Sequence, residues 1–239
     1  MSETTIAVVA GRAADSAAGA QTREEIRLLI DEIGVLPSIR TASLEDAFFA
    51  AEAIARAGIP VLEISVTVPG AAGIISELAK RAPGMIVGAG GISNATAARR
   101  CLDQGARFLA SYGLLPEVVE LTAKEGVVVI PGGLTPTEIM AAWNAGSDFV
   151  KVYPCGLVGG HKYIRSLKAA LPEVRLIAAG GVDQLTALEL IAAGASALSI
   201  GSELFPEEAV WLRESRRVQE LARRFLSFVD KARSKSRPA

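Results

Sequence analysis

Two ionisable side chains, those of Lys151 and Glu63, interrupt short apolar segments of the sequence. Lys151 lies in the segment Phe149–Pro154 and Glu63 lies in Val61–Ser65; both segments are typical of buried strands in a parallel sheet. Because burial disfavours an ammonium group, such a lysine can act as a neutral amine that attacks a carbonyl carbon. A buried carboxyl group can transfer protons. The two residues together indicate a nucleophilic lysine assisted by a general acid–base residue.

A structural ion pair is the alternative interpretation of both residues. Lys151 could pair with Glu63 or with Asp148 across the interior and do no chemistry. The other lysines fall on predicted helices or in the C-terminal tail, where exposure to solvent is expected: Lys80, Lys124, Lys162, Lys168, Lys231 and Lys235. Since Lys151 is the exception and Glu63 lies in the same predicted core, we favour the catalytic interpretation.

Three features at the ends of predicted strands could bind anions. Arg40 ends the first strand, where a guanidinium could hold a carboxylate or a phosphate, although arginines at such positions are also common on solvated surfaces. Gly180 and Gly181 follow the seventh predicted strand, and Gly201 and Ser202 follow the eighth. Barrels often bind phosphate on these two loops, because glycine lets backbone N–H groups approach the anion. The two turns therefore predict a phosphate site.

The composition narrows the class of protein. The chain has 239 residues, a formal net charge of −1, one histidine and two cysteines. The balanced charge argues against nucleic acid or an anionic membrane as a partner. One histidine excludes a zinc site built from several histidines, and two cysteines provide no disulfide framework. No segment is typical of a signal peptide or long enough to span a membrane. We therefore expect a soluble, cytoplasmic protein.

Strand and helix patterns alternate along the chain and predict one (β/α)8 barrel over residues 21–239, preceded by a disordered tail over residues 1–20. An N-terminal helix is expected after a Thr22 cap. The strands are expected at Val35–Arg40, Pro60–Ile64, Met85–Gly88, Arg107–Ser111, Val127–Ile130, Asp148–Tyr153, Val174–Ala178 and Ala197–Ile200. An open doubly wound sheet is the alternative, but no glycine-rich nucleotide-binding motif follows the first strand.

Helices are expected between these strands, and one long helix is expected to close the chain from about Glu207 to Lys231. Glycines in left-handed conformation should end five of the helices: Gly58, Gly105, Gly126, Gly146 and Gly194. The glycine-rich segment Gly88–Gly91 predicts a close approach of the backbone to a ligand, or else a strained turn.

The order and spacing of several motifs resemble the class I, Schiff-base aldolase family that cleaves 2-keto-3-deoxy-6-phosphogluconate and 4-hydroxy-2-oxoglutarate. The resemblance runs from about Val35 to Phe205, nearly the whole barrel. The motifs are Pro37-Ser38-Ile39-Arg40, Leu62-Glu63-Ile64, Thr67-Val68-Pro69, Val87-Gly88-Ala89-Gly90, Ile130-Pro131-Gly132, Val150-Lys151-Val152-Tyr153-Pro154, Gly180-Gly181-Val182 and Ile200-Gly201-Ser202.

The resemblance implies that Lys151 forms a Schiff base with the keto carbon and that Glu63 shuttles protons. It implies a phosphate site at Gly180, Gly181, Gly201 and Ser202. The expected substrate-binding residues are Arg40, Thr67, Gly90, Gly91, Tyr112, Tyr153, Pro154 and Ala179. The resemblance further implies a homotrimer that needs no metal or other cofactor, and pyruvate and glyceraldehyde 3-phosphate as products.

Three residues depart from the pattern of this family. Gly91 and Ala179 stand where threonines are usual, and Tyr112 stands where a proline is common. Two hydroxyl groups are therefore lost on the substrate side, although the Tyr112 hydroxyl could supply another. The departures leave three keto acids open as the substrate: 2-keto-3-deoxy-6-phosphogluconate, its galactonate epimer, and 4-hydroxy-2-oxoglutarate. A phosphate-binding isomerase or epimerase and a non-catalytic barrel are the alternatives in other classes.

Overall fold

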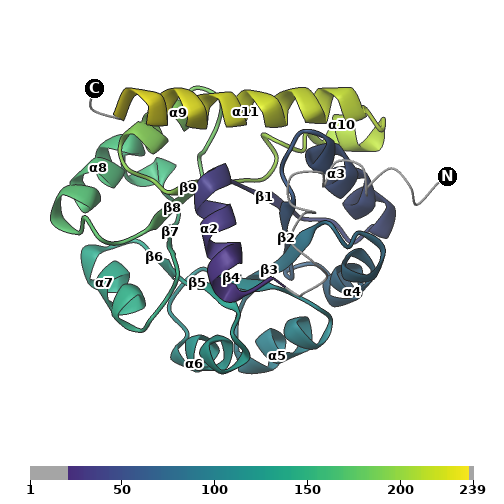
Figure 1. The fold of residues 1–239 in the computed structure, drawn as a ribbon, viewed down its shortest axis with the longest axis horizontal. Coiled ribbons are helices and arrows are strands. Elements are labelled where there is room, and N and C mark those ends of the chain that lie inside the picture. Colours follow the sequence, from purple (N-terminus) through teal and green to yellow (C-terminus); the bar gives the residue numbers. More distant parts are fainter. Residues whose placement is uncertain (1–20, 237–239) are drawn as a thin grey trace.

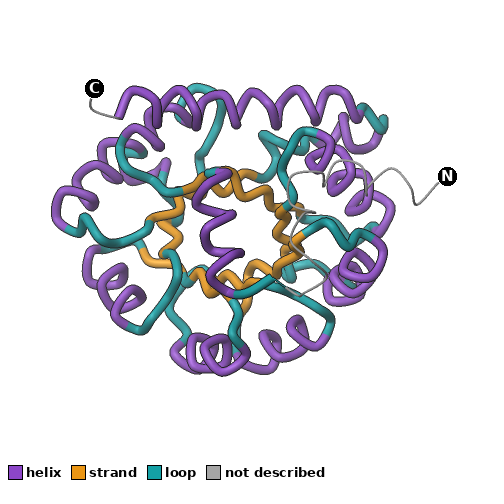
Figure 2. Tube along the Cα trace, in the orientation of Figure 1, coloured by secondary structure: helices purple, strands orange, loops and turns teal. Residues whose placement is uncertain are grey.

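The computed structural model describes residues 21–236. The tail predicted over residues 1–20 lies outside the described part. Within residues 21–236, nine parallel strands form one sheet, in the order β5-β4-β3-β2-β1-β9-β8-β7-β6, that curls into a ring with helices outside (Figures 1 and 2). The strands are β1 Val35–Ile39, β2 Val61–Ser65, β3 Ile86–Ile92, β4 Phe108–Ser111, β5 Val128–Ile130, β6 Gly132–Gly133, β7 Val150–Val152, β8 Leu176–Ala179 and β9 Ala197–Ile200. The predicted barrel is confirmed.

The fifth strand of the barrel is divided at Pro131 into β5 and β6. β5 pairs with β4 on one side, and β6 pairs with β7 on the other. The Val129 carbonyl accepts a hydrogen bond from the Asp148 N–H at 3.1 Å, and the Pro131 carbonyl accepts one from the Lys151 N–H at 2.8 Å. These two bonds join the divided strand to the chain that leads into β7. The ring is therefore closed along the strand that carries Lys151.

Helices alternate with the strands around the outside of the ring (Figure 2). These outer helices are α3 Leu44–Arg56, α4 Ala71–Arg81, α5 Ala95–Asp103, α6 Pro116–Glu125, α7 Pro136–Asn144, α8 His161–Ala170, α9 Ala187–Ala192, α10 Glu207–Trp211 and α11 Ser215–Ser236, with a short 3₁₀ turn at Gly156–Val158. Helix α2 Arg23–Ile33 precedes the first strand and lies across one end of the ring (Figure 1). The five glycines expected to end helices all have φ between 64° and 106°, so that prediction is confirmed.

The prediction of one closing helix from Glu207 to Lys231 is wrong. The chain forms α10 and α11, and between them Arg213 has φ of 55°, in the left-handed region. The Arg213 guanidinium lies 2.7 Å from the Asp46 carboxylate at the start of α3. This ion pair stabilises a break that no glycine or proline marks in the sequence.

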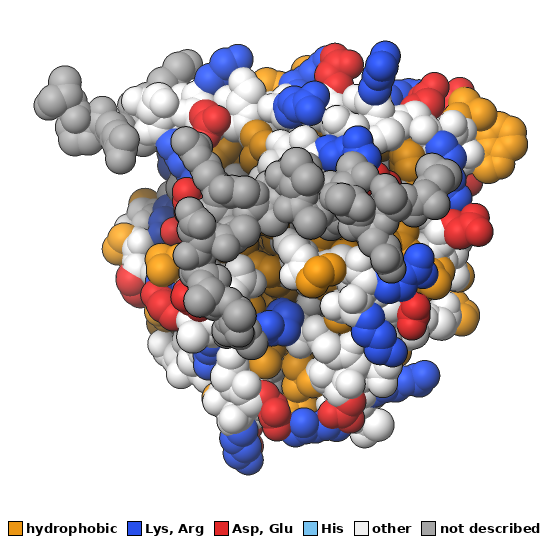
Figure 3. Space-filling view, turned by 45° about the vertical axis from the view of Figure 1, so that its right-hand side comes forward, with side chains coloured by type: hydrophobic (Ala, Val, Ile, Leu, Met, Phe, Trp, Pro, Cys, Tyr) orange, Lys and Arg blue, Asp and Glu red, His pale blue; other side chains and the backbone are white. Residues whose placement is uncertain are grey.

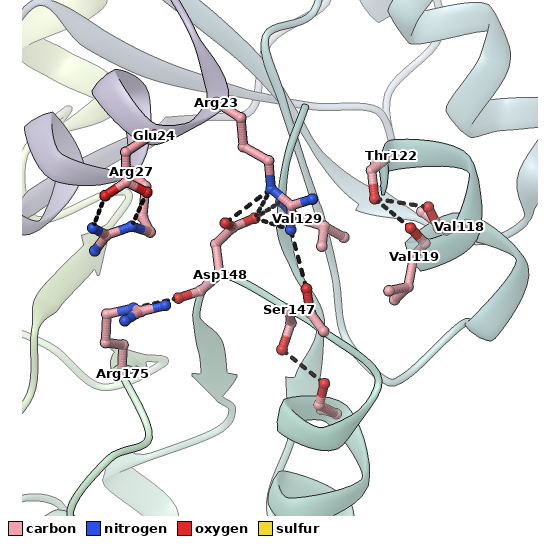
Figure 4. A network of polar contacts seen from close by, with 12 residues as sticks. Arg23, Glu24, Arg27, Val118, Val119, Thr122, Val129, Ser147, Asp148 and Arg175 are labelled. Carbon is pink, nitrogen blue, oxygen red and sulfur yellow. Dashed lines mark hydrogen bonds and ion pairs between the residues drawn. The ribbon is translucent and has the colours of Figure 1, made fainter. Parts of the chain in front are cut away.

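Helix α2 crosses the ring at the end where the strands begin (Figure 1). Thr22 and Glu25 form the capping box that starts this helix. Arg23 binds the Asp148 carboxylate at 3.0 Å, and the same carboxylate accepts the Val129 N–H at 2.8 Å (Figure 4). The Arg175 guanidinium donates to the Asp148 carbonyl at 2.7 Å (Figure 4). This network attaches α2 to the barrel and closes its floor.

Charged side chains of both signs are scattered over the face seen in Figure 3, without one broad basic area. Among the helices of the described region, none combines the length and the apolar character needed to cross a membrane. The interior is mostly aliphatic, with Phe108, Phe149 and Phe225 among its largest fully buried side chains.

Candidate active site

The two buried charges predicted to do chemistry meet inside the barrel. Lys151 on β7 and Glu63 on β2 are each 4 % exposed, and the Lys151 Nζ lies 2.8 Å from Glu63 Oε2. Asp148, the other partner considered for Lys151, binds Arg23 on the floor. An ammonium group in direct hydrogen-bond contact with a carboxylate can pass it a proton, and the neutral amine that results can attack a carbonyl carbon. The contact is therefore compatible with the predicted chemistry and also with a structural ion pair.

The second oxygen of Glu63 is held by Ser38 on β1. The Ser38 hydroxyl donates to Glu63 Oε1 at 2.8 Å, and the two residues are direct partners in the register of β1 and β2. Each carboxylate oxygen of Glu63 thus has one close partner. Ser38 was not among the predicted site residues, although a hydroxyl inside an apolar strand, two residues before Arg40, was a signal that could have indicated it.

Two glycines of the segment Gly88–Gly91 make room for side chains of the protein itself. A Cβ atom on Gly90 would lie 2.1 Å from Glu63 Oε1, and one on Gly88 would lie 2.3 Å from the Phe108 ring. The missing side chain of Gly90 therefore leaves room for the Glu63 carboxylate, and that of Gly88 leaves room for the Phe108 ring. The sequence predicted a close approach of this backbone to a ligand, or else a strained turn; the approaches present in the structure are to Glu63 and Phe108 of the protein itself.

Gly91 has a different role from its neighbours, because its backbone is left-handed. Its φ is 78°, and the pairing of β3 with β4 shifts register at this point. A Cβ atom here would lie 3.0 Å from Thr67 Cγ2, and the Thr67 hydroxyl is 2.9 Å from the Ser65 hydroxyl. Thr67 and Gly91 also line a cavity of about 710 Å³ beside Arg100. A threonine could not adopt this backbone without strain.

Arg40, Tyr112 and Tyr153 lie together at the mouth of the barrel. The Arg40 Nη2 donates to the Tyr112 hydroxyl at 3.2 Å, and the Tyr112 and Tyr153 rings lie 4.8 Å apart. Both tyrosines are exposed. The Tyr112 hydroxyl thus contacts the guanidinium predicted to bind a carboxylate, and it lies near the rim of the site.

The glycine pair after β8 packs against the loop that follows β7. Gly180 and Gly181 have φ of 75° and 81°, and a Cβ on Gly180 would lie 3.0 Å from the Tyr153 ring and 3.1 Å from Pro154 Cα. The Ala179 carbonyl accepts the Cys155 N–H at 2.8 Å. The close contact keeps the two loops side by side at the mouth of the barrel.

The turn after β9 lines a cavity with residues of β1. Gly201 and Ser202 share this cavity, of about 680 Å³, with Ser38 and Arg40. Four residues at the carboxyl ends of two neighbouring strands therefore face one space, which is where barrels bind substrate. Glu207 is also part of its lining.

Two other groups bear on the chemistry of the site. Burial raises the pKa of the Cys155 thiol to about 11, so this cysteine, although next to the Tyr153–Pro154 segment, is a poor nucleophile at neutral pH. Among the residues described, no three His, Cys, Asp or Glu side chains gather in a group that could hold a metal ion.

Comparison with known proteins gives one consistent family. A family model described as "KDPG and KHG aldolase" matches residues 26–221. A 2-dehydro-3-deoxy-phosphogluconate aldolase of Pseudoalteromonas atlantica is 29% identical over 189 residues, which are 79% of this chain and 88% of that protein. A probable 2-dehydro-3-deoxy-6-phosphogalactonate aldolase of Rhizobium meliloti is 31% identical over 169 residues, which are 70% of this chain and 79% of that protein.

A solved structure adds a chemical observation about a relative. The KDPG aldolase of Legionella pneumophila, with pyruvate captured at low pH as a covalent carbinolamine intermediate, is 27% identical to this chain with a TM-score of 0.76. The match covers 82% of this chain and 96% of that one.

Proposed function

This chain belongs to the KDPG and KHG aldolase family of class I aldolases, and we propose that it cleaves a 2-keto-3-deoxy sugar acid through a Schiff base on Lys151. The foremost substrate is 2-keto-3-deoxy-6-phosphogluconate, with pyruvate and glyceraldehyde 3-phosphate as products. The observation that carries the proposal is the contact of 2.8 Å between the buried Lys151 Nζ and Glu63 Oε2. The covalent carbinolamine captured in the Legionella pneumophila relative supports the same chemistry.

Glu63 would serve the reaction by moving protons at two points. The Lys151 amine attacks the keto carbon, and a proton supplied from Glu63 lets the carbinolamine hydroxyl leave as water. The Glu63 carboxylate then accepts the proton of the substrate hydroxyl as the adjacent carbon–carbon bond breaks. The electron pair of that bond passes to the iminium nitrogen and leaves an enamine. Protonation of the enamine and hydrolysis of the imine release pyruvate and restore the amine.

The groups at the mouth suggest how the substrate is oriented. Arg40, joined to the Tyr112 hydroxyl at 3.2 Å, would bind the carboxylate end. Gly180, Gly181, Gly201 and Ser202 would bind the phosphate through backbone N–H groups and a hydroxyl. The galactonate epimer and 4-hydroxy-2-oxoglutarate are the other substrates within the same proposal. A homotrimer located in the cytoplasm belongs to it as well, by resemblance to the family.

Borohydride reduction in the presence of pyruvate tests the nucleophile. We expect irreversible inactivation and one pyruvate-derived mass increment on Lys151. Lys168 is an internal comparison, because desolvation lowers its pKa and its amine donates to the Val174 carbonyl at 2.8 Å. An increment on Lys168 alone, or no increment, would contradict the Schiff-base proposal and favour an isomerase or a non-catalytic barrel. Repeating the trap with 2-keto acids that carry or lack a terminal phosphate tests the substrate.

A further inference from the structure

Ser38 contacts the Glu63 carboxylate and is also one of the residues that line the cavity beside Gly201 and Ser202. Its hydroxyl donates to Glu63 Oε1 at 2.8 Å, and the residue also lines the cavity shared by Arg40, Gly201 and Ser202. A hydroxyl has one donor and two acceptor lone pairs, so it can donate to Glu63 and still accept a hydrogen bond from another group. Ser38 therefore holds Glu63 from a strand that also borders this cavity.

The Ser38 hydroxyl fixes an oxygen, Glu63 Oε1, that its other neighbour does not hold. That neighbour is Gly90, which has no side chain and lies so close that an added Cβ would be 2.1 Å from Oε1. Lys151 contacts the opposite oxygen, Oε2. Among the hydrogen bonds of the described residues, the Ser38 hydroxyl is the side-chain donor to Oε1. A buried carboxylate oxygen without a donor is strongly unfavourable.

We propose that Ser38 is a positioning residue that holds the Glu63 carboxylate in the orientation in which Oε2 faces the Lys151 amine. The proposal rests on the function proposed above. Without the Ser38 hydroxyl, Oε1 loses its side-chain donor and the carboxylate rotates, so proton transfer to and from the Lys151 adduct slows. Binding of the keto acid is unaffected, because the groups assigned to its carboxylate and phosphate do not change.

The test compares Ser38→Thr with Ser38→Val, two side chains of the same shape that differ in the hydroxyl. The assays are the rate of borohydride-trapped adduct formation with pyruvate, and deuterium exchange of the pyruvate methyl group in D2O followed by NMR. We expect Ser38→Val to be slower by about tenfold in both, which corresponds to about 1.4 kcal/mol of barrier. Ser38→Thr should stay within about twofold of the natural protein, and the pyruvate concentration at half-maximal rate should not change.

Ser147→Ala is the matched control for loss of a buried serine hydroxyl. Ser147 is 6 % exposed and donates to the Ala142 carbonyl at 2.7 Å, on the floor of the barrel. Its removal should lower the melting temperature and leave both rates unchanged. Equal rates for the threonine and valine variants, at any level, overturn the role of Ser38. If the natural protein itself forms no adduct and exchanges no deuterium, the proposed function fails, and that result is distinct from a failure of Ser38 alone.

Discussion

Gly90→Ala should displace the Glu63 carboxylate without changing its chemistry. The new Cβ would lie 2.1 Å from Glu63 Oε1 and 2.2 Å from its Cδ. To reach an ordinary contact of about 3.4 Å from the new Cβ, Oε1 must move by about 1.3 Å, the difference from the present 2.1 Å. The end of the glutamate side chain can move by this amount while the backbone stays in place. The move stretches the contacts with Lys151 and Ser38, which are both 2.8 Å.

A displacement of about 1 Å in a catalytic group can reduce the rate about 100-fold. We therefore expect kcat for keto-acid cleavage, measured by a coupled assay for pyruvate, to fall by about that factor. The matched control is Gly88→Ala, whose Cβ would lie 2.3 Å from the fully buried Phe108 ring. Because this ring is packed in the core, the control should lose about 1–3 kcal/mol of unfolding free energy in urea and keep most of its kcat. A Gly90→Ala variant with the natural kcat would refute the placement of Glu63.

Three further predictions address the floor, the mouth and the thiols. Asp148→Asn removes the charge that binds Arg23 at 3.0 Å. Because Arg23 is partly exposed, we expect the unfolding free energy in urea to fall by only about 2 kcal/mol and kcat to stay unchanged. A loss of kcat without a loss of stability would contradict this. Gly91→Thr places a β-branched residue at a φ of 78°, so it should cost about 1–3 kcal/mol and fail to tighten pyruvate binding in a titration. Cys101 and Cys155 both have a pKa raised by burial to about 11; since the thiolate is the reactive form, iodoacetamide should label neither in the folded protein at pH 8, and fast labelling at that pH would show that the thiols are accessible.

The residues that were easiest to predict from the sequence were those whose chemistry differs from that of their neighbours. A lysine and a glutamate inside apolar strands, Lys151 and Glu63, are costly enough to require a partner, and the structure places them in contact. The glycines at helix ends were predictable for a related reason, because a left-handed backbone favours glycine. In both cases the local residue type carried the information.

The features that escaped prediction depend on contacts between distant segments. The register of β1 and β2 pairs Ser38 with Glu63, and a hydroxyl within an apolar strand did not by itself identify that partner. At the break between α10 and α11, Arg213 pairs with Asp46, a residue far away in the chain. The conformation of Gly91 depends on the register shift between β3 and β4. Strand patterns predict that such pairings exist, and they do not specify which residues face each other.

The contact between Lys151 and Glu63 joins the two halves of the ring. Glu63 comes from the first half of the ring and Lys151 from the second, 88 residues later. A fragment that ends within α6 would contain the carboxylate and lack the amine, and the complementary fragment would contain the reverse. Under the proposed mechanism, neither half would form the adduct alone. Mixing the two halves would generate trapping by borohydride only as they assemble into a complete ring, so the amount of trapped Lys151 would count the reconstituted barrels.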